Sequence, residues 1–361
     1  DNQSIIESTA AVPMNDQDAS DRLVDTVRSA LNSRTPVYIR GGKSKRFLHQ
    51  AHQATELDSR DHSGILHLDA ERMTIRARAG TLLAELNQAL NGKGLMLAFE
   101  PPSFAPTATV GGMVACGLAG PRQPWAGAVG KHLLGGRLID GLGRQRGFGI
   151  DATESILVGN PSQLLAGSLG ELGLFTEICL KVRAKPACSR TLRLEIERGF
   201  ALSLMRKWRL CASPISAFCH TGDALYLRLE GSAATVRKAS DQLGGLEANA
   251  NFWEELREHQ LGFFRDPRPL WRLSLPEDAP LSPELPGAIL LDWCGAQRWL
   301  KSDAPAAAVR RLAERLGGYA SGFTPGATEL PLRHNPTTRS QPFLELKEHL
   351  DPHRLFGTLA D

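Results

Sequence analysis

The sequence predicts an α+β protein with two domains. Its 361 residues exceed what one hydrophobic core usually holds, and 42% hydrophobic with 22% charged residues is an ordinary globular composition. Glycine-rich loops adjoin predicted strands in the first half, whereas short strands alternate with helices in the second half. The Lys185-Pro186 step separates the two patterns and marks the predicted domain boundary.

Charge and cysteine usage exclude several classes of protein. The formal net charge is only +3, with basic and acidic residues interspersed, so no nucleic-acid surface is indicated. Because no C-x-x-C pair occurs, we expect no metal site in this chain, and any iron–sulfur cluster would belong to a partner. Reduced thiols are expected at all six cysteines: Cys116, Cys179, Cys188, Cys211, Cys219 and Cys294.

The N-terminal residues and the distribution of apolar residues predict the location of the protein. The first twenty residues are polar and acidic, and no apolar stretch approaches the length of a membrane span. We therefore expect a cytoplasmic protein that reaches the inner face of the membrane only through partner subunits.

The first elements follow from local patterns. A helix is expected to begin at Ser20, and a strand over 37–40 opens into the glycine turn 41–45. Two strands are expected within 64–79, and an amphipathic helix over 82–90 leads into the segment that follows.

Residues 99–121, with the sequence FEPPSFAPTATVGGMVACGLAGP, form the most informative segment. Gly111, Gly112, Gly117 and Gly120 have no Cβ and tolerate positive φ, so successive N–H groups can converge there on one anion, such as a pyrophosphate. The alternative is a compact loop whose glycines only serve tight turns.

A third glycine-rich loop supports the anion site. Strands are expected over 133–139 and 145–149, and the loop 167–173 then precedes an alternating strand over 174–182. Three such loops in one domain predict an extended anionic ligand that lies across strand ends, with backbone N–H groups neutralising its phosphates.

The second half predicts an antiparallel sheet with helices on one face, in the ferredoxin-like arrangement. The expected strands are 192–197, 215–219, 225–230, 270–275 and 288–293, and the expected helices are 202–210, 233–243, 251–261 and 305–316.

Other nucleotide and hydrolase motifs are incomplete. Gly42-Lys43-Ser44 follows a strand as in a P-loop, but Val37 occupies the position of the earlier glycine. Gly141-Leu142-Gly143 resembles a dinucleotide fingerprint, yet Arg146 occupies the third glycine position. The motifs H-E-x-x-H and G-x-S-x-G do not occur, so hydrolytic chemistry is not indicated.

These residues resemble the FAD domain of the vanillyl-alcohol oxidase/PCMH flavoprotein family, and within it the FAD-binding subunits of bacterial glycolate oxidase. The resemblance covers nearly the whole chain, including 252–261, 275–280 and 292–301 in the second half. The matching motifs are Gly41-Gly42 with its basic tail, Glu100-Pro101-Pro102, the run 108–121, and Gly167-Ser168-x-Gly170-x-x-Gly173-x-x-Thr176-Glu177.

The resemblance implies that the chain is divided into three parts. A PCMH-type FAD-binding domain of two α+β subdomains, with the cofactor between them, would span 1–186. A smaller ferredoxin-like α+β cap domain would span 187–335. The segment 336–361 would then return to the FAD domain.

The resemblance also implies the residues that bind FAD. The loop 41–45 and the segment 109–120 would hold the pyrophosphate, and 173–178 would lie against the flavin or the adenosine. The full predicted set is Gly41, Gly42, Lys43, Ser44, Lys45, Pro101, Pro102, Thr109, Val110, Gly111, Gly112, Ala115, Cys116, Gly117, Gly120, Gly167, Gly170, Gly173, Thr176, Glu177 and Ile178.

The implied reaction is FAD-dependent oxidation of glycolate, or a similar small 2-hydroxy acid, to the 2-oxo acid. Electrons would pass to partners in the complex, namely a paralogous FAD subunit and an iron–sulfur subunit, which fits the missing cluster ligands. A 2-hydroxy acid needs a base and a cation for its carboxylate, and the sequence does not rank the candidates Arg122, His132, Arg137 and His220.

Two departures from the family pattern motivate an alternative. Family members carry a Lys-Asn-Val-Ala-Gly-Tyr-Asp-Leu run where this chain has 154–161, so Glu154 replaces a cation. The chain also keeps Leu355-Phe356-Gly357 without the usual Asn-Pro-Gly-Arg ending. The alternative is a non-catalytic scaffold subunit of the same complex with weak or no flavin binding.

Overall fold

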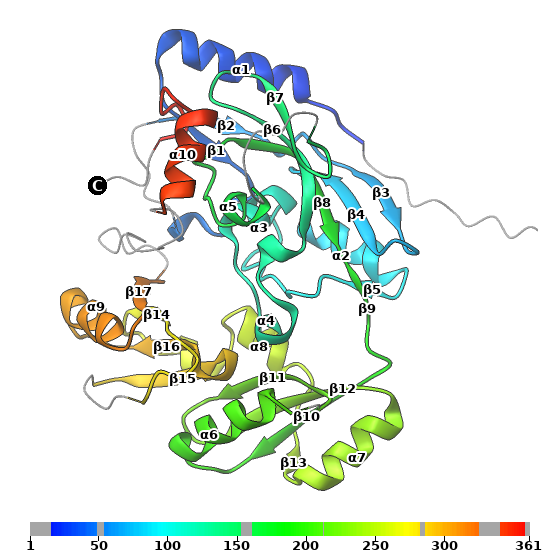
Figure 1. Ribbon diagram of the computed structural model, residues 1–361, viewed down its shortest axis with the longest axis vertical. Helices are drawn as coiled ribbons and strands as arrows, with labels where there is room; N and C mark the ends of the chain where they lie inside the picture. Colours follow the sequence, from blue (N-terminus) through cyan, green and yellow to red (C-terminus); the bar gives the residue numbers. More distant parts are fainter. Residues whose placement is uncertain are drawn as a thin grey trace, which may run out of the picture.

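The computed structural model describes residues 16–48, 54–152, 161–211, 213–281, 286–324 and 340–357. These residues form two lobes (Figure 1). The first lobe contains the elements up to β9 (Arg183–Ala184) together with the C-terminal helix, and the second contains the elements from β10 (Cys188–Leu194) to β17 (Tyr319–Gly322). The fold is α+β, as the sequence predicts, whereas the numerical domain limits stay predictions.

The N-terminal part of the first lobe carries the first glycine turn. Helix α1 (Ser20–Ser33) buries Leu23 and Val27 against the parallel pair of β1 (Val37–Arg40) and β2 (Thr55–Asp58). The turn after β1 is therefore fixed at the end of a packed strand.

A five-stranded antiparallel sheet forms the rest of this lobe. Its order is β3 (Ile65–Asp69), β4 (Thr74–Arg78), β8 (Leu174–Lys181), β6 (Leu133–Ile139) and β7 (Gln145–Gly149). The alternation along 174–182 is typical of a strand with one wet face, but β8 is the central strand and is buried on both faces. A two-residue strand, β5 (Leu95–Met96), pairs separately with β9.

The glycine-rich segment 109–120 is not a continuous loop. Helix α3 (Val110–Cys116) occupies most of it and packs with α2 (Leu83–Asn91) against the five-stranded sheet. Thr109 caps α3, because its Oγ1 accepts a hydrogen bond from the N–H of Gly112 at 3.2 Å.

The second lobe is built on an eight-stranded sheet in the order β13-β10-β12-β11-β15-β16-β14-β17. The expected strands are present, and β16 (Gln297–Lys301), β17 and β13 (Leu246–Glu247) were not expected. The others are β11 (Ile215–His220), β12 (Leu225–Gly231), β14 (Leu270–Ser274) and β15 (Ala288–Asp292).

Three of the four predicted helices cover one face of this sheet, whereas the fourth, α8 (Phe252–Arg257), lies on the other face. Helices α6 (Arg198–Arg209), α7 (Ala233–Leu243) and α9 (Ala306–Arg315) pack on the first face. The other face meets α8 and residues of the first lobe, and α8 is shorter than the predicted 251–261. The second face therefore forms the junction between the lobes (Figure 1).

The C-terminal helix packs on the first lobe. Helix α10 (Gln341–Leu350) buries Phe343 and Leu346 in that core. The Lys347 ammonium donates to the carbonyl of Glu171 at 2.6 Å and to the Asp351 carboxylate at 2.7 Å. These buried bonds connect the end of the chain to the third glycine loop.

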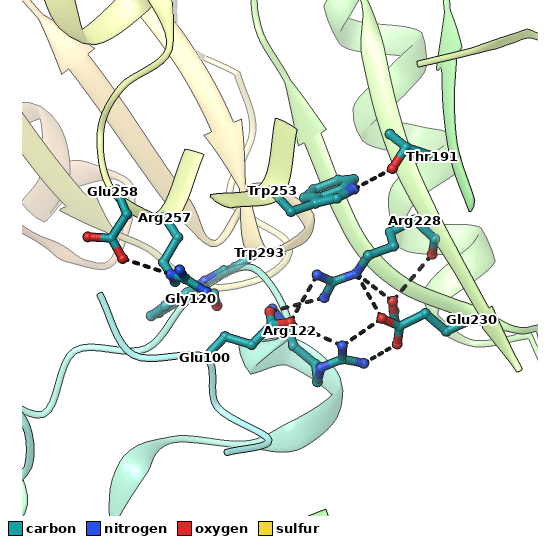
Figure 2. A network of polar contacts seen from close by, with 11 residues as sticks. Glu100, Gly120, Arg122, Thr191, Arg228, Glu230, Trp253, Arg257, Glu258 and Trp293 are labelled. Carbon is teal, nitrogen blue, oxygen red and sulfur yellow. Dashed lines mark hydrogen bonds and ion pairs between the residues drawn. The ribbon is translucent and has the colours of Figure 1, made fainter. Parts of the chain in front are cut away.

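A network of buried ion pairs crosses the lobe junction (Figure 2). Glu100 and Arg122 come from the first lobe, and Arg228 and Glu230 come from β12. Arg122 bonds Glu100 at 3.0 Å and chelates Glu230, while Arg228 donates to both Glu100 oxygens at 2.9 and 3.0 Å. All four side chains are at most 9% exposed, so each charge depends on its partners for stabilisation.

The pKa values of the two carboxyl groups show that attraction outweighs burial. Burial alone would raise the pKa of Glu100, but Arg228 and Arg122 bring it below its ordinary value of 4.5. Burial would likewise raise the pKa of Glu230, yet its bond to Arg122 lowers it. Both groups therefore stabilise the fold as carboxylates.

We expect Glu100→Gln to lower the free energy of unfolding by about 3 kcal/mol, because it leaves two buried guanidinium groups short of a counter-charge. Urea unfolding at neutral pH measures the loss. The pKa of Glu100 is lower in the folded protein than its ordinary value of 4.5, so its stabilising contribution is present above pH 4.5 and disappears as the pH falls. The difference in the free energy of unfolding between wild type and variant should therefore narrow below that pH.

Glu195→Gln provides the control, because Glu195 is 72% exposed and pairs with Arg193 at the surface. That change should lower the free energy of unfolding by less than about 0.5 kcal/mol. Equal losses in the two variants would contradict a stabilising role for the buried network.

Candidate functional site

A cleft in the first lobe collects the three glycine-rich segments. It lies where the turn after β1, the start of α3 and the loop before β8 meet. The predicted residues that line it are Gly41, Gly42, Lys43, Ser44, Lys45, Thr109, Gly111, Gly112, Ala115, Cys116, Gly170 and Gly173.

The turn 41–45 offers a row of hydrogen-bond donors. Within the described ranges, the five successive backbone N–H groups from Gly41 to Lys45 have no acceptor. Lys43 is held beside the cleft by Glu56, at 2.6 Å between Nζ and Oε1. Burial lowers the pKa of Lys45, whose ammonium donates to the carbonyl of Ser103 at 3.2 Å. Unpaired N–H groups beside cations form a site for an anion.

Close packing explains the two glycines of this turn. A Cβ on Gly42 would lie 1.6 Å from the carbonyl oxygen of Thr107, and one on Gly41 would lie 2.7 Å from Oγ1 of Thr109. Thr107 also donates its hydroxyl to the Gly42 carbonyl at 2.7 Å. The turn therefore reaches its position against α3 only without side chains.

The glycines of α3 were expected to offer their N–H groups to an anion, but these groups are already hydrogen-bonded. The N–H of Gly111 donates to Ala79 at 2.7 Å and that of Gly112 to Thr109, so neither is available to a ligand. A Cβ on Gly111 would lie 2.8 Å from the Cβ of Ala79, so this glycine allows the helix to contact the sheet. The first turn of α3 shapes the cleft, and the turn after β1 supplies the donors.

The loop before β8 closes the cleft from the other side. Gly170 has φ of +86°, which favours glycine, and the N–H of Leu169 donates to Ala115 of α3 at 2.8 Å. Leu169 and Phe175 add apolar surface to the lining. Further lining residues that were not in the predicted set are Tyr38, Ile39, Arg46, Ser59, Ala79 and Leu174.

The remaining predicted residues lie outside this cleft. Thr176 and Ile178 are buried in β8, and Glu177 pairs with Arg76 at 3.4 Å. Pro102 and Gly120 line a second, smaller cavity between the lobes. Pro101, Val110, Gly117 and Gly167 line neither space.

The four candidates for substrate chemistry lie in the ion network, at the surface or against backbone carbonyls. Arg122 is held in the buried ion network, and Arg137 is 56% exposed beside Glu177. The rings of His132 and His220 pair with the carbonyls of Ala126 and Ile196, each at 3.0 Å, and burial lowers the pKa of both. None of the four lines either space.

The second cavity contains residues that the sequence analysis did not name as site candidates. They are Arg257 at the end of α8, His259 after it, Arg272 of β14, and Asp292 and Gln297 at the turn from β15 to β16. Antiparallel strand pairing brings Arg272 near Asp292 and Gln297, whereas Arg257 and His259 come from α8 and the turn after it.

One predicted feature lies outside the described residues. Glu154 belongs to 153–160, which the structure does not describe. In the described ranges, no cluster of three His, Cys, Asp or Glu residues is arranged to bind a metal. No helix among the described residues is long and apolar enough to cross a bilayer.

Fold and site together define an FAD-binding flavoprotein. The family model described as "FAD binding domain" matches residues 18–149, which include the turn 41–45 and α3. In the solved structure of an alkyldihydroxyacetonephosphate synthase, the fold is similar with a TM-score of 0.64 at 17% identity, over 94% of this chain and 74% of that one. This likeness supports the PCMH-type fold.

The sequence relatives identify the family. The chain is 43% identical to "Glycolate oxidase subunit GlcE" of Escherichia coli (strain K12) over 340 residues, which cover 94% of this chain and 96% of the relative. It is 27% identical to "Glycolate oxidase subunit GlcD" of Bacillus subtilis (strain 168), over 36% of this chain and 27% of the relative. The chain belongs to the family of the glycolate oxidase subunit GlcE.

The residues of the cleft fit FAD. The free N–H groups of 41–45 and the ammonium groups of Lys43 and Lys45 suit a diphosphate, and the glycine turn leaves room for its approach. Ile39, Leu169 and Phe175 supply apolar contacts for ring systems.

We expect Gly42→Ala to weaken FAD binding by at least about tenfold. The added Cβ would meet the Thr107 carbonyl at 1.6 Å, so the turn and its N–H groups must move. Titration of flavin fluorescence measures the affinity. Gly92→Ala is the matched control, because Gly92 has an ordinary helical φ of −61° and its nearest new contact is at 3.6 Å. Equal affinities for FAD in the two variants would contradict this role of the turn.

Proposed function

We propose that this chain is the FAD-binding subunit of a complex that oxidises glycolate, or a similar small 2-hydroxy acid, to the 2-oxo acid. The observation that carries the proposal is the 43% identity to the Escherichia coli subunit across 96% of that relative. The cleft supports it, because its donors and glycines suit the diphosphate of FAD.

Each part of the cleft has a task in this function. FAD, when bound, supplies the acceptor for the hydride that leaves the carbon of the hydroxy acid. The N–H groups of 41–45 bind the diphosphate, and Lys45, which is only 7% exposed, adds positive charge beside them.

Aromatic side chains exclude water where the lobes meet. The rings of Phe47 and Phe323 contact edge to face at 5.1 Å, and Phe104 packs against Phe323 at 6.2 Å. Phe47 and Phe104 belong to the first lobe and Phe323 to the second, so this contact covers the junction from solvent. A dry junction protects a hydride transfer from competing reactions.

The proposal includes partners that remove the electrons. The related proteins are named as subunits, which favours a complex with a paralogous FAD subunit. An iron–sulfur subunit would complete the path, since the six cysteines here are spaced too widely for a local cluster motif. We place the complex in the cytoplasm, in contact with the membrane through its partners.

The purified chain should carry a flavin absorption band, and glycolate should bleach that band within one turnover under anaerobic conditions. The reason is that the hydride of glycolate reduces the bound flavin. Stopped-flow absorbance measures the bleaching, and acetate, which has no hydroxyl group to oxidise, is the control.

Two outcomes would contradict the proposal in different ways. A chain that neither carries a flavin band nor gains thermal stability from added FAD has no cofactor. A flavin that stays oxidised with glycolate, in the chain and in the assembled complex, would exclude glycolate as the substrate.

A further inference from the structure

The segment 347–357, which we name the C-terminal clasp, contains the Leu355-Phe356-Gly357 motif that the proposed function leaves without a task. The clasp consists of the last turn of α10 and the turn that follows it. None of these residues lines the FAD cleft or the second cavity. Any effect of the clasp on a ligand therefore acts through the residues that it contacts.

Lys347 stands at the centre of the clasp. Its ammonium donates to the Asp351 carboxylate at 2.7 Å, to the carbonyl of Gly357 at 2.7 Å and to the carbonyl of Glu171 at 2.6 Å. An ammonium group has three N–H donors, so these bonds use its full capacity. The side chain is only 7% exposed, and the bonds are therefore shielded from water.

The bond to Glu171 reaches one wall of the FAD cleft. Glu171 belongs to the loop 167–173 and lies between Gly170 and Gly173, which both line the cleft. These glycines have φ of +86° and +142°, where the backbone of the loop depends on the freedom of glycine. A bond from outside to the middle of such a loop restricts its position.

A second contact of the clasp reaches the opposite wall. The N–H of Val37, the first residue of β1, donates to the carbonyl of Leu355 at 2.8 Å. Strand β1 leads directly into the turn 41–45 that carries the donors of the cleft. The buried side chains of Leu355 and Phe356 pack in one cluster with Val37 and Leu174. The clasp is thus attached to both walls.

Asp351 fixes the shape of the clasp. Its carboxylate accepts the N–H groups of Leu355 at 2.8 Å and of Phe356 at 3.0 Å, in addition to the Lys347 ammonium. The Asp351 side chain is fully buried, so its charge depends on Lys347 for compensation. The ion pair therefore holds the turn that carries Leu355 in place relative to the ammonium that bonds Glu171.

We propose that Lys347 is a positioning residue for FAD, because through the clasp it holds the loop 167–173 and the turn 41–45 at the separation at which FAD binds between them. The inference rests on the assignment of FAD to the cleft, and it requires no contact between the clasp and FAD. By thermodynamic linkage, FAD bound between the two walls stabilises the clasp in return.

The first test compares Lys347→Met with Lys301→Met by titration of flavin fluorescence. Lys301 is the matched control, because it is 6% exposed and donates to the carbonyls of Asp266 and Arg268 at 2.7 and 3.1 Å, but in the second lobe. Lys347→Met should weaken FAD binding at least about tenfold, since the loop 167–173 loses its bond to the clasp. Lys301→Met should bind FAD as the wild type does, and equal affinities in the two variants overturn the proposal.

A double variant separates positioning from a general loss of stability. Lys347→Met alone leaves the Asp351 carboxylate buried without a counter-charge, which destabilises the fold. Lys347→Met combined with Asp351→Asn removes both charges, so its Tm should return toward that of the wild type while its affinity for FAD stays low. An affinity that recovers together with the Tm overturns the proposal, because the bond to Glu171 is still missing.

Hydrogen exchange gives a readout that needs no cofactor. In the chain without FAD, the double variant should exchange its amide hydrogens faster than the wild type over 167–173 and 37–45, with no change in the second lobe. In the wild type, added FAD should slow exchange over 347–357. Unchanged exchange in both walls overturns the positioning role, even where the wild type binds FAD.

The Gly42→Ala variant distinguishes failure of this inference from failure of the FAD site. Weaker FAD binding in Gly42→Ala but not in the Lys347 variants overturns the positioning role alone. FAD binding that is unchanged in Gly42→Ala contradicts the cleft as the FAD site and overturns the positioning role with it. Weaker binding in both, with wild-type affinity in Lys301→Met, supports both assignments.

Discussion

Four buried charges determine how the two lobes meet. Glu100 and Arg122 stand at the two ends of the segment that contains α3, and their contact at 3.0 Å closes that segment into a loop. Arg228 and Glu230 attach this closed loop to β12 of the second lobe. Because unpaired charges are costly in a buried junction, the lobes have one favoured registry. The loop after α3 is thereby placed opposite β14 and β16.

The two spaces use different chemistry. The FAD cleft depends on backbone: free N–H groups of 41–45 and a turn that fits against Thr107 only with glycine at position 42. The second cavity depends on side chains, since Arg272 and His259 reach it from separate elements of the second lobe.

The sequence predicted the parts of the molecule that local rules govern. The turn after β1 and the loop before β8 are set by glycines and neighbouring strands, and both line the FAD cleft. The glycines of α3 were harder to interpret, because Gly111 is needed for contact with Ala79 and not for a free N–H group. Composition alone does not separate these two needs.

The second cavity could not be predicted, and the reason is topological. Arg272 lies in a strand whose partners, β16 and β17, were not expected, so nothing in the sequence placed it beside Asp292 and Gln297. His259 follows a helix that ends at Arg257, several residues before the predicted end. A longer helix would have placed its ring on a helical face, whereas its positive φ turns the chain toward Trp299. Long-range strand pairing and one residue with positive φ thus create a cavity that no local pattern encodes.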